Sequence, residues 1–432
     1  MASPFLRSKS PVHTVLFAAV AAAAILLLLA GFREMQTPLV SDPQSILSSS
    51  VIAAPANGLV VDPQLPSTLG TSAPAAAPAA AIADAAAPLA APAPGQAAGQ
   101  SPVPAVDAVF LIPLTSTHFN FCRSLYTALM NDYPKPTLIN WGQTFKNGAQ
   151  ARVNKIIGID NVLNKLREDQ YAIIMDGFDV WYQLPYKDFV NHYLDYTREN
   201  DHSVVVFGAD KKCWPNDLKS PACVNIPNST LPDDIFGAHT DDANFITDPA
   251  TKYIYHRPRW LNSGNMFGPV KVLRQVYERA NYLITHAPPD MVFSDQMYIA
   301  EVYGQQNLPM TVDFTSELFQ TMTFSHNDLM FVDDDVLASP RKPPSERRRY
   351  AFNRVSGALP PVLHFNGPKQ AMDAWWPKMW WSTERSNPAV IAKSEEVFKT
   401  GGAFDTDGNF IPWGEICKGI DVHKPSGYIS PR

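Results

Sequence analysis

The sequence predicts an α/β fold with a mixed, mainly parallel sheet and helices on both of its faces. Short continuous apolar runs at 108–112, 171–175 and 203–207 have the pattern of strands buried on both faces of a sheet. Between these runs lie longer segments with apolar residues at helical spacing. This alternation of strand and helix is typical of βαβ units, which build parallel sheets.

The expected elements follow one another closely from residue 108 onward. We expect strands at 108–112, 137–140, 171–175 and 203–207, and helices at 119–131, 150–167 and 189–197. Ligands of such sheets collect at the carboxyl ends of the strands. The run 171–175 ends directly at Asp176, so we expect that aspartate to lie where a ligand binds.

The N-terminal quarter of the sequence predicts a membrane anchor and a stalk rather than a folded domain. Residues 14–32 form an uncharged apolar run, long enough as a helix to cross a hydrocarbon core, and Arg7 and Lys9 precede it. The positive-inside rule then leaves 1–13 in the cytosol and the rest in the lumen of the Golgi or endoplasmic reticulum, a type II arrangement. A cleaved signal peptide is the alternative. Residues 33–104 are rich in proline and alanine and predict an extended spacer, which leaves 105–425 as the folded domain.

Charge and cysteine content narrow the class of protein. The net charge of −6 argues against a nucleic-acid binder, which usually carries a basic face. Cys213 and Cys223 are close enough for a short disulfide ring, Cys122 is either a small buried residue or a partner in a bridge, and Cys417 is free or paired. The absence of a CxxC pair argues against structural zinc. Asn228 begins a glycosylation sequon, in keeping with a lumenal domain.

The segment Asp176-Gly-Phe-Asp179 has the composition of a site for a hard divalent cation. Manganese and magnesium prefer oxygen ligands and need few carboxylates when phosphate and water complete the shell. Two aspartates in a tight turn after a strand provide them, with Phe178 expected to pack inward. An Asx-turn or a helix N-cap is the structural alternative.

Three later segments carry polar residues at the ends of expected elements. The segment 260–268, WLNSGNMFG, reads as a turn that brings backbone close to a ligand, or as an ordinary hairpin turn. The segment 293–298, FSDQMY, places an acid and an amide at the start of a helix, where an N-cap is the alternative. The segment 362–369, VLHFNGPK, is a strand that ends at His364, which is either a ligand or a core histidine.

In this order, DGFD, LNSGNMFG, SDQMY and HFNGPK resemble the glycosyltransferase domain of the procollagen lysyl hydroxylases, over residues 108–381. That family carries Asp-x-x-Asp, a Leu-x-Ser-Gly-Gly turn, Asp-Asp-Gln-Leu-Phe-Tyr and His-Gly-Asn-Gly-Pro. The segments 209–215 and 312–320 add to the likeness. The resemblance implies a GT-A fold, Mn²⁺ (or Mg²⁺), a UDP-sugar donor, and retaining transfer of a hexose, glucose or galactose, to a protein or glycan hydroxyl.

The resemblance also assigns roles to individual positions of this chain. Asp176, Asp179 and His364 match the metal ligands. Gly367 and Lys369 match the turn beside the diphosphate. The sugar-side pocket corresponds to Asn262, Ser263, Gly264, Asp295 and Gln296, of which Asp295 and Gln296 are the candidate catalytic residues. Thr115 and Trp141 are expected near the nucleoside, and Lys155 near the phosphates.

Departures from the family pattern leave the donor sugar and the acceptor open. The run of aspartates before the DQ pair is reduced to Ser294-Asp295, and Asn265 replaces the second glycine of the Ser-Gly-Gly turn. No HxD…H iron-site pattern follows, so no hydroxylase domain is expected. The clusters 333–335 (DDD) and 347–349 (RRR) are expected in solvated loops, and the tryptophans after residue 374 are expected to pack against the core.

Two other functions fit part of the sequence. A lumenal protein that keeps the fold and binds metal and UDP-sugar without turnover is compatible with the altered SDQ and SGN segments. A metal-dependent phosphohydrolase with Asp176 as nucleophile or ligand would need a second acidic or histidine cluster spaced for two metals. The sequence shows no convincing second cluster of that kind.

Overall fold

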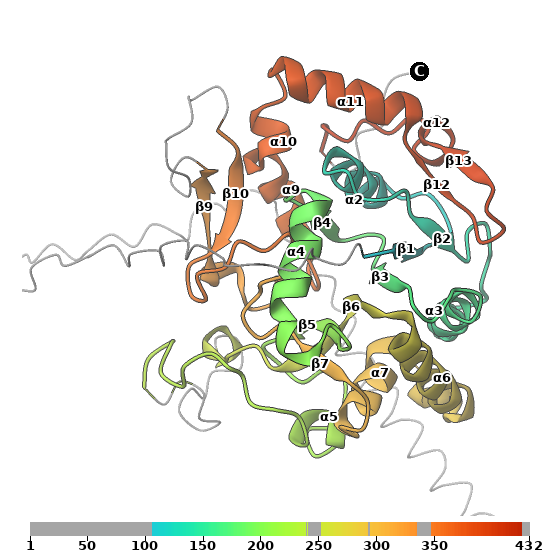
Figure 1. Cartoon of the computed structure of the whole chain (residues 1–432), viewed down its shortest axis with the longest axis vertical. Helices are drawn as coiled ribbons and strands as arrows, with labels where there is room; N and C mark the ends of the chain where they lie inside the picture. The colour runs from blue at the N-terminus through green and yellow to red at the C-terminus, as the bar shows by residue number, and fades with distance from the viewer. Residues whose placement is uncertain (1–105, 239, 241–251, 293, 335–346, 426–432) are drawn as a thin grey trace, which may run out of the picture. The chain divides into compact units, whose positions relative to one another are not determined.

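The computed structural model describes residues 106–425 except 239, 241–251, 293 and 335–346 (Figure 1). The chain divides into two compact units, Met1–Gly95 and Gln96–Arg432, and all described residues belong to the second. The predicted cytosolic tail, membrane anchor and stalk, at 1–13, 14–32 and 33–104, therefore lie outside the described residues. Within the described part of the chain, no helix is both long and apolar enough to span a bilayer.

A mixed sheet forms the centre of the described domain, as predicted. Its eight strands among the described residues have the order β13-β12-β2-β1-β3-β6-β5-β7. Neighbouring strands are parallel except where β6 lies between β3 and β5 and where β13 pairs with β12. The strands are β1 (Ala108–Pro113), β2 (Thr137–Ile139), β3 (Tyr171–Met175), β5 (Val205–Asp210), β6 (Trp260–Pro269), β7 (Met310–Val312), β12 (Gly402–Phe404) and β13 (Phe410–Pro412).

Helices cover both faces of the main sheet. Successive residues of a strand point to opposite faces of the sheet, so an apolar strand has side chains to bury on both. In β1, Phe110 and Ile112 join one apolar cluster, while Leu111 joins the other. The first face is covered by α2 (Phe119–Met130), α4 (Tyr186–Tyr196), α9 (Gln370–Trp375), α10 (Trp380–Thr383), α11 (Pro388–Thr400) and α12 (Trp413–Ile416). The second is covered by α3 (Gly148–Leu163), α5 (Pro221–Val224), α6 (Val270–His286) and α7 (Asp295–Gly304), with α3 and α6 side by side (Figure 1).

Two smaller sheets flank the main one. A three-stranded sheet has the order β4-β11-β8, with β4 at Val180–Tyr182, β8 at Phe319–Thr321 and β11 at Val362–His364. A hairpin pairs β9 (Leu329–Asp333) with β10 (Arg349–Asn353). Short 3₁₀ turns complete the described elements: η1 (Arg198–Asn200), η2 (Lys252–Tyr255), η3 (Pro289–Met291), η4 (His326–Asp328) and η6 (Trp376–Lys378).

The predicted elements up to residue 207 are confirmed, with shifts at their ends. The second predicted helix ends at Leu163 rather than at residue 167, and the third begins at Tyr186. The predicted helix after residue 293 is confirmed as α7, and the predicted strand ending at His364 as β11.

The turn predicted at 260–268 is wrong, because this segment is β6, a central strand of the main sheet. Its glycines are explained by close neighbours instead of by a turn. A Cβ on Gly268 would lie 2.6 Å from the Cα of Val205 on the adjacent strand. Glycine inside a strand often marks such a close approach.

One residue of each charged cluster lies in a strand of the hairpin rather than in the predicted solvated loop, and Asp335 lies outside the described residues. Asp333 ends β9 and pairs with Arg349 of β10 at 2.8 Å, while Asp334 is buried. Arg348 lies 4.3 Å from the ring centre of Trp380. The packing role of the late tryptophans is confirmed, since Trp376, Trp380, Trp381 and Trp413 are all buried.

Two disulfides tie the domain together. The predicted Cys213–Cys223 bridge is confirmed, and Cys122 of α2 is bonded to Cys417, which follows α12. The second pairing resolves the alternatives that the sequence left open for both residues. The bonded positions are 295 residues apart in one bridge and 10 in the other.

Removal of the long-range bridge is expected to destabilise the protein more than removal of the short one. Chain-entropy arguments put the difference between Cys122→Ser/Cys417→Ser and Cys213→Ser/Cys223→Ser at about 3 kcal/mol, since a longer closed loop restricts the unfolded chain more. Denaturant unfolding of both double variants measures this difference. Equal losses of unfolding free energy would contradict the entropic explanation.

Candidate metal and donor site

The segment 176–179 connects the main sheet to the three-stranded sheet. β3 ends at Met175 and β4 begins at Val180, so the intervening turn is held at both ends. The backbone N–H of Asp176 donates to the carbonyl of Gly264 in β6 at 2.7 Å, and the N–H of Phe365 donates to the carbonyl of Asp179 at 2.7 Å. The turn therefore has little freedom to move.

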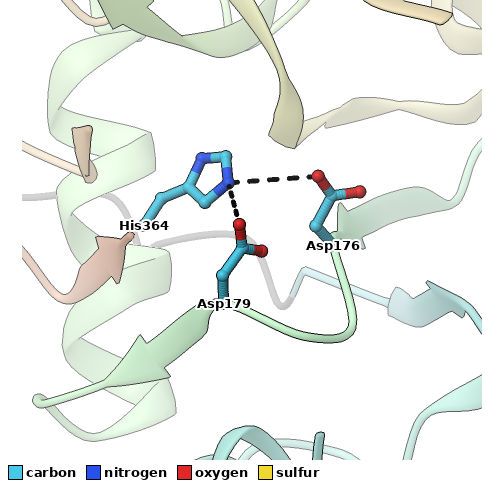
Figure 2. Close-up of side chains that lie close together, drawn as sticks. All are labelled: Asp176, Asp179 and His364. Carbon is cyan, nitrogen blue, oxygen red and sulfur yellow. Dashed lines mark ion pairs between the residues drawn. The ribbon is translucent and has the colours of Figure 1, made fainter. Parts of the chain in front are cut away.

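His364 reaches the two aspartates through strand pairing. β11 runs antiparallel to β4 and places His364 opposite Val180, next to Asp179. Its Nε2 lies 3.5 Å from a carboxylate oxygen of Asp179 and 3.9 Å from one of Asp176 (Figure 2). The side chain is 2% exposed, and neither ring nitrogen makes a well-formed hydrogen bond to any described residue. A buried imidazole nitrogen without such a bond is costly unless another partner completes it.

This arrangement fits a divalent cation. The three ligand atoms lie within 4.8 Å of one another, and theirs is the one such group of His, Cys, Asp or Glu among the described residues. Adjacent ligands of an octahedral ion with bonds of ~2.1 Å lie about 3 Å apart. The distances from Nε2 of His364 to the two carboxylates, 3.5 and 3.9 Å, are somewhat longer than this. Two carboxylates and one imidazole suit manganese or magnesium and leave other positions for phosphate or water.

Gly264 leaves the space in which these side chains meet. A Cβ on this residue would lie 2.3 Å from Cε1 of His364 and 2.7 Å from Oδ2 of Asp176. Any larger residue would displace the ligands. The sequence singled out Gly264 as part of a turn, but the structure explains it by the approach of β6 to the cluster.

Two lysines contact the acidic groups of the site. Nζ of Lys155, from α3, lies 2.7 Å from Asp176 and 2.6 Å from Asp295. Nζ of Lys369 donates to Asp179 and to the carbonyl of Phe365. Both ammonium groups therefore lie beside the predicted ligands, where they can also meet the oxygens of a bound phosphate.

The cluster shifts the pKa of each of its members. Burial lowers the pKa of His364, but Asp179 and Asp176 outweigh burial, so the net shift is upward. Burial raises the pKa of Asp179, yet His364 and Lys369 more than compensate and bring it to about 2. Burial raises the pKa of Asp176, and the other carboxylates add to this shift against the effect of Lys155.

These shifts predict that Mn²⁺ affinity falls at acid pH. A raised pKa keeps the proton on His364 up to higher pH, and a metal ion has to displace that proton. Affinity is then constant above the raised pKa and falls about tenfold per pH unit below it. Calorimetric Mn²⁺ titrations between about pH 5 and 8 test this. An affinity that does not change over this range would exclude His364 as a ligand.

The predicted sugar-side residues form one hydrogen-bonded group beside the cluster. The side-chain oxygen of Asn262 accepts from the N–H of Gly264 at 2.9 Å. Gln296 accepts from the N–H of Ser263 at 3.2 Å and donates to the carbonyl of Trp214 at 2.6 Å. Asp295 accepts from the hydroxyl of Ser263 at 3.4 Å. These side chains come from β6 and α7, which the sequence places more than thirty residues apart at these positions.

Asp210 is a site residue that the sequence interpretation missed. It ends β5, is 8% exposed, and accepts from the side-chain amides of Asn262 at 3.0 Å and Asn366 at 2.8 Å. Burial raises the pKa of its carboxyl group, against the effect of those amides and of His364. The strand-end rule that identified Asp176 applies equally to Asp210, so the signal was present.

A pocket of about 330 Å³ opens beside these residues. It is lined by Asp210, Lys211, Lys212, Trp214, Asn262, Gln296, Thr323, Phe324, Asn366 and Gly367. Gly367 has a φ of 93°, which suits the predicted turn, and a Cβ there would lie 2.6 Å from the hydroxyl of Thr323. The pocket is large enough for a sugar ring and carries several hydrogen-bonding groups.

Thr115 and Trp141 lie on the other side of Asp176. They follow β1 and β2, and the carbonyl of Thr115 accepts from the N–H of Gly142 at 2.8 Å. Trp141 is half-buried. Phe178, which we expected to pack inward, is 39% exposed and contacts the ring of His118 edge-on at 4.9 Å. The ring points outward because Gly177, and not Phe178, faces Ile112 and Leu114.

Comparisons with known proteins add little to this geometry. No protein-family model matches the chain, and no curated protein matches it. Among solved structures, a glycosyltransferase involved in the glycosylation of the major capsid of PBCV-1 is similar, with 10% identity and a TM-score of 0.34, covering 62% of this chain and 97% of that one. A likeness at this level shows nothing about activity.

Proposed function

We propose that this protein is a metal-dependent glycosyltransferase that transfers a hexose from a UDP-sugar to an acceptor hydroxyl. The observation that carries the proposal is the convergence of Asp176, Asp179 and His364 at strand ends, with a buried imidazole nitrogen aimed between the carboxylates. Two lysines adjoin this cluster, and so does a pocket whose lining includes several hydrogen-bonding side chains. The order of the four motifs, which resembles the lysyl hydroxylase glycosyltransferase domain, supports the same reaction.

In this proposal Asp176, Asp179 and His364 hold Mn²⁺ or Mg²⁺. The bound ion would act as a Lewis acid toward the diphosphate. Lys155 and Lys369 donate to phosphate oxygens, and Thr115 and Trp141 contact the nucleoside. In the transfer, the bond from the sugar C1 to the UDP oxygen breaks, a bond from C1 to the acceptor oxygen forms, and the acceptor loses its proton.

The pocket residues orient the sugar and the acceptor. Asn262 and Gln296 are themselves held by hydrogen bonds, so their polar groups are preorganised rather than mobile. The carboxylate of Asp210 lines the same pocket and can accept a proton from an acceptor hydroxyl. Asp295, whose pKa burial raises but Lys155 lowers by more, stays ionised beside Lys155 and Ser263.

The alternative functions make different predictions. Two-metal phosphohydrolases need a second ligand cluster, and the described residues contain one candidate cluster alone. A protein that binds UDP-sugar without turnover shares the whole site and differs in activity. Release of hexose or UDP therefore separates the proposal from a binding protein, and release of phosphate from simple esters would favour the hydrolase.

A donor screen tests the proposed function directly. The full-length protein is heated with each UDP-hexose in turn, with and without Mn²⁺. A ligand at a hundred times its Kd stabilises the native state by about 2.7 kcal/mol, so the correct donor raises the melting temperature only when the metal is present. No shift with any nucleotide-sugar, despite bound Mn²⁺, would rule out the proposal.

We also propose a lumenal location, in a type II arrangement. The sequon at Asn228 provides a test, because Asn228 is exposed in the loop after α5. Expression in a eukaryotic secretory pathway is expected to give a glycosidase-sensitive mobility shift that Asn228→Gln removes. An unglycosylated wild-type protein would argue against lumenal exposure.

A further inference from the structure

Asn265 of β6 is a buried polar residue whose side chain has no partner among the described residues. It is 0% exposed, and neither its amide oxygen nor its amide nitrogen makes a hydrogen bond to any of them. Buried polar side chains are nearly always hydrogen-bonded, so an exception needs a physical explanation. The lining of the 330 Å³ pocket does not include Asn265, so a sugar bound there is not the missing partner.

The backbone of β6 is irregular at this residue. Two successive residues of β5 pair with residues of β6 that lie four positions apart, Met266 and Asn262. The residues between them, 263–265, therefore form a bulge. A bulge interrupts the regular alternation of side chains and can re-aim them, and bulges are frequent beside active sites. The direction of the Asn265 side chain is thus set by a local feature of the strand that adjoins the metal cluster.

The Asn265 amide lies close to the strand that carries His364. A Cβ on Gly208 of β5 would lie 2.2 Å from Oδ1 of Asn265 and 3.3 Å from Cγ2 of Thr321, so these two side chains share the space over Gly208. Thr321 of β8 is in register with His364 of the adjacent parallel strand β11. Asn265 also follows Gly264, whose Cβ would lie 2.3 Å from Cε1 of His364. The amide and the imidazole therefore lie in neighbouring positions.

His364 has an unpartnered group of its own. Its Nε2 lies between the two carboxylates, while Nδ1 lies on the side of the ring turned away from them (Figure 2). Nδ1 makes no hydrogen bond to any described residue. A neutral imidazole that binds a metal through Nε2 carries its proton on Nδ1, and metal-binding histidines almost always donate that N–H to an oxygen. The metal site therefore requires an acceptor beside Nδ1.

Asp210 is the other acceptor in this region, and its electrostatic effect reaches His364. Both of its carboxylate oxygens already accept hydrogen bonds, one from the amide of Asn262 at 3.0 Å and one from the amide of Asn366 at 2.8 Å. The amide oxygen of Asn265, in contrast, accepts from no described donor. Asn265 is therefore the acceptor with unused capacity.

We propose that Asn265 is a positioning residue for the metal, and that its amide oxygen accepts from the Nδ1–H of His364 when Nε2 binds the cation. This inference rests on the metal site of the proposed function. The hydrogen bond would hold the ring in the tautomer whose Nε2 lone pair faces Asp176 and Asp179. The lysyl hydroxylase family has glycine at this position of its turn. The departure in this chain then acts on a metal ligand rather than on the sugar.

Asn265→Leu tests the inference, because leucine has a similar branched shape and no acceptor. The amide has no described partner in the metal-free protein, so the variant is expected to melt at or above the wild-type temperature without metal. Its Mn²⁺ affinity is expected to fall by about 10–100-fold, as for other partners of metal-binding histidines. Calorimetric titration of the full-length protein with Mn²⁺ alone, and melting curves without metal, measure the two quantities.

Two further variants isolate the oxygen. Asn265→Asp keeps an acceptor oxygen at the same place and is expected to bind Mn²⁺ at least as tightly as the wild type, since carboxylates commonly accept from metal-binding histidines. Asn281→Leu is the matched control. It removes an amide that donates to Asp160 at 2.7 Å between α3 and α6, outside the cluster, and is expected to change Mn²⁺ affinity by less than about twofold.

The outcomes separate this inference from the proposed function. If the wild-type protein binds Mn²⁺ and Asn265→Leu binds it equally tightly, the inference is overturned and the proposed function stands. A loss of both melting temperature and Mn²⁺ affinity in Asn265→Leu that Asn265→Asp does not restore shows a packing role, and also overturns it. If the wild-type protein itself binds no Mn²⁺, the proposed function fails and this inference fails with it.

Discussion

Asp179→Ala is expected to reduce Mn²⁺-dependent turnover of the UDP-hexose by about a thousandfold or more. The metal's Lewis-acid role is worth several kcal/mol in the transition state, and each 1.36 kcal/mol is tenfold in rate. The variant loses one of three ligands and leaves His364 with a single carboxylate at 3.9 Å. Steady-state release of UDP, with the donor found in the screen, measures the loss.

Asp290→Ala is the matched control for this variant. Asp290 is exposed in η3 and lies outside the cluster, so removal of its carboxylate tests whether loss of any surface charge lowers turnover. Its turnover is expected to remain within about twofold of wild type. Retention of Mn²⁺ binding and activity in Asp179→Ala would show that the cluster is structural and would remove the main support for the proposed function.

Gly264→Ala is expected to abolish metal binding without replacement of any ligand. The added Cβ would lie 2.3 Å from Cε1 of His364, whose ring is buried and has little room to move. Overpacking of this kind typically costs about 1–3 kcal/mol in stability, so the variant should still fold. Mn²⁺ titration by calorimetry, together with a melting curve, separates loss of the site from loss of the fold.

Gly414→Ala provides the comparison, since no atom lies within 4 Å of a Cβ placed there and Gly414 lies in the short helix α12. It is expected to keep wild-type metal affinity and to melt at or slightly above the wild-type temperature, because alanine favours helix over glycine. Normal Mn²⁺ affinity in Gly264→Ala would mean that the ligands are looser than the structure shows.

Local pattern was sufficient to predict β1, β2, β3, β5 and β11 and the positions of two site residues. An apolar run followed at once by a polar residue reports a buried strand and its exposed end, and both Asp176 and His364 stand at such ends. Asp210 carries the same signal at the end of β5. These predictions depend only on residues that are adjacent in the chain, so a single sequence is sufficient for them.

The largest error of the sequence-based prediction, the turn at 260–268, also has a local cause. The segment 260–269 contains two glycines, two asparagines and a serine, a composition typical of turns, and yet it is the central strand β6. Gly264 and Gly268 have no side chain because His364, Asp176 and Val205 approach the strand at these two positions. Only the packing of distant segments shows why the strand cannot carry a larger residue there.

The sequence by itself determined the α/β class and the candidate ligands, because burial of a strand leaves its mark on consecutive residues. The tertiary structure decided which distant segments are in contact. The antiparallel pairing of β4 with β11 brings His364 to Asp179. In the same way, β6 lies between β3 and β5, and Cys122 is bonded to Cys417. Contacts between segments so far apart depend on the packing of the whole domain, and short-range patterns in the chain carry no record of them.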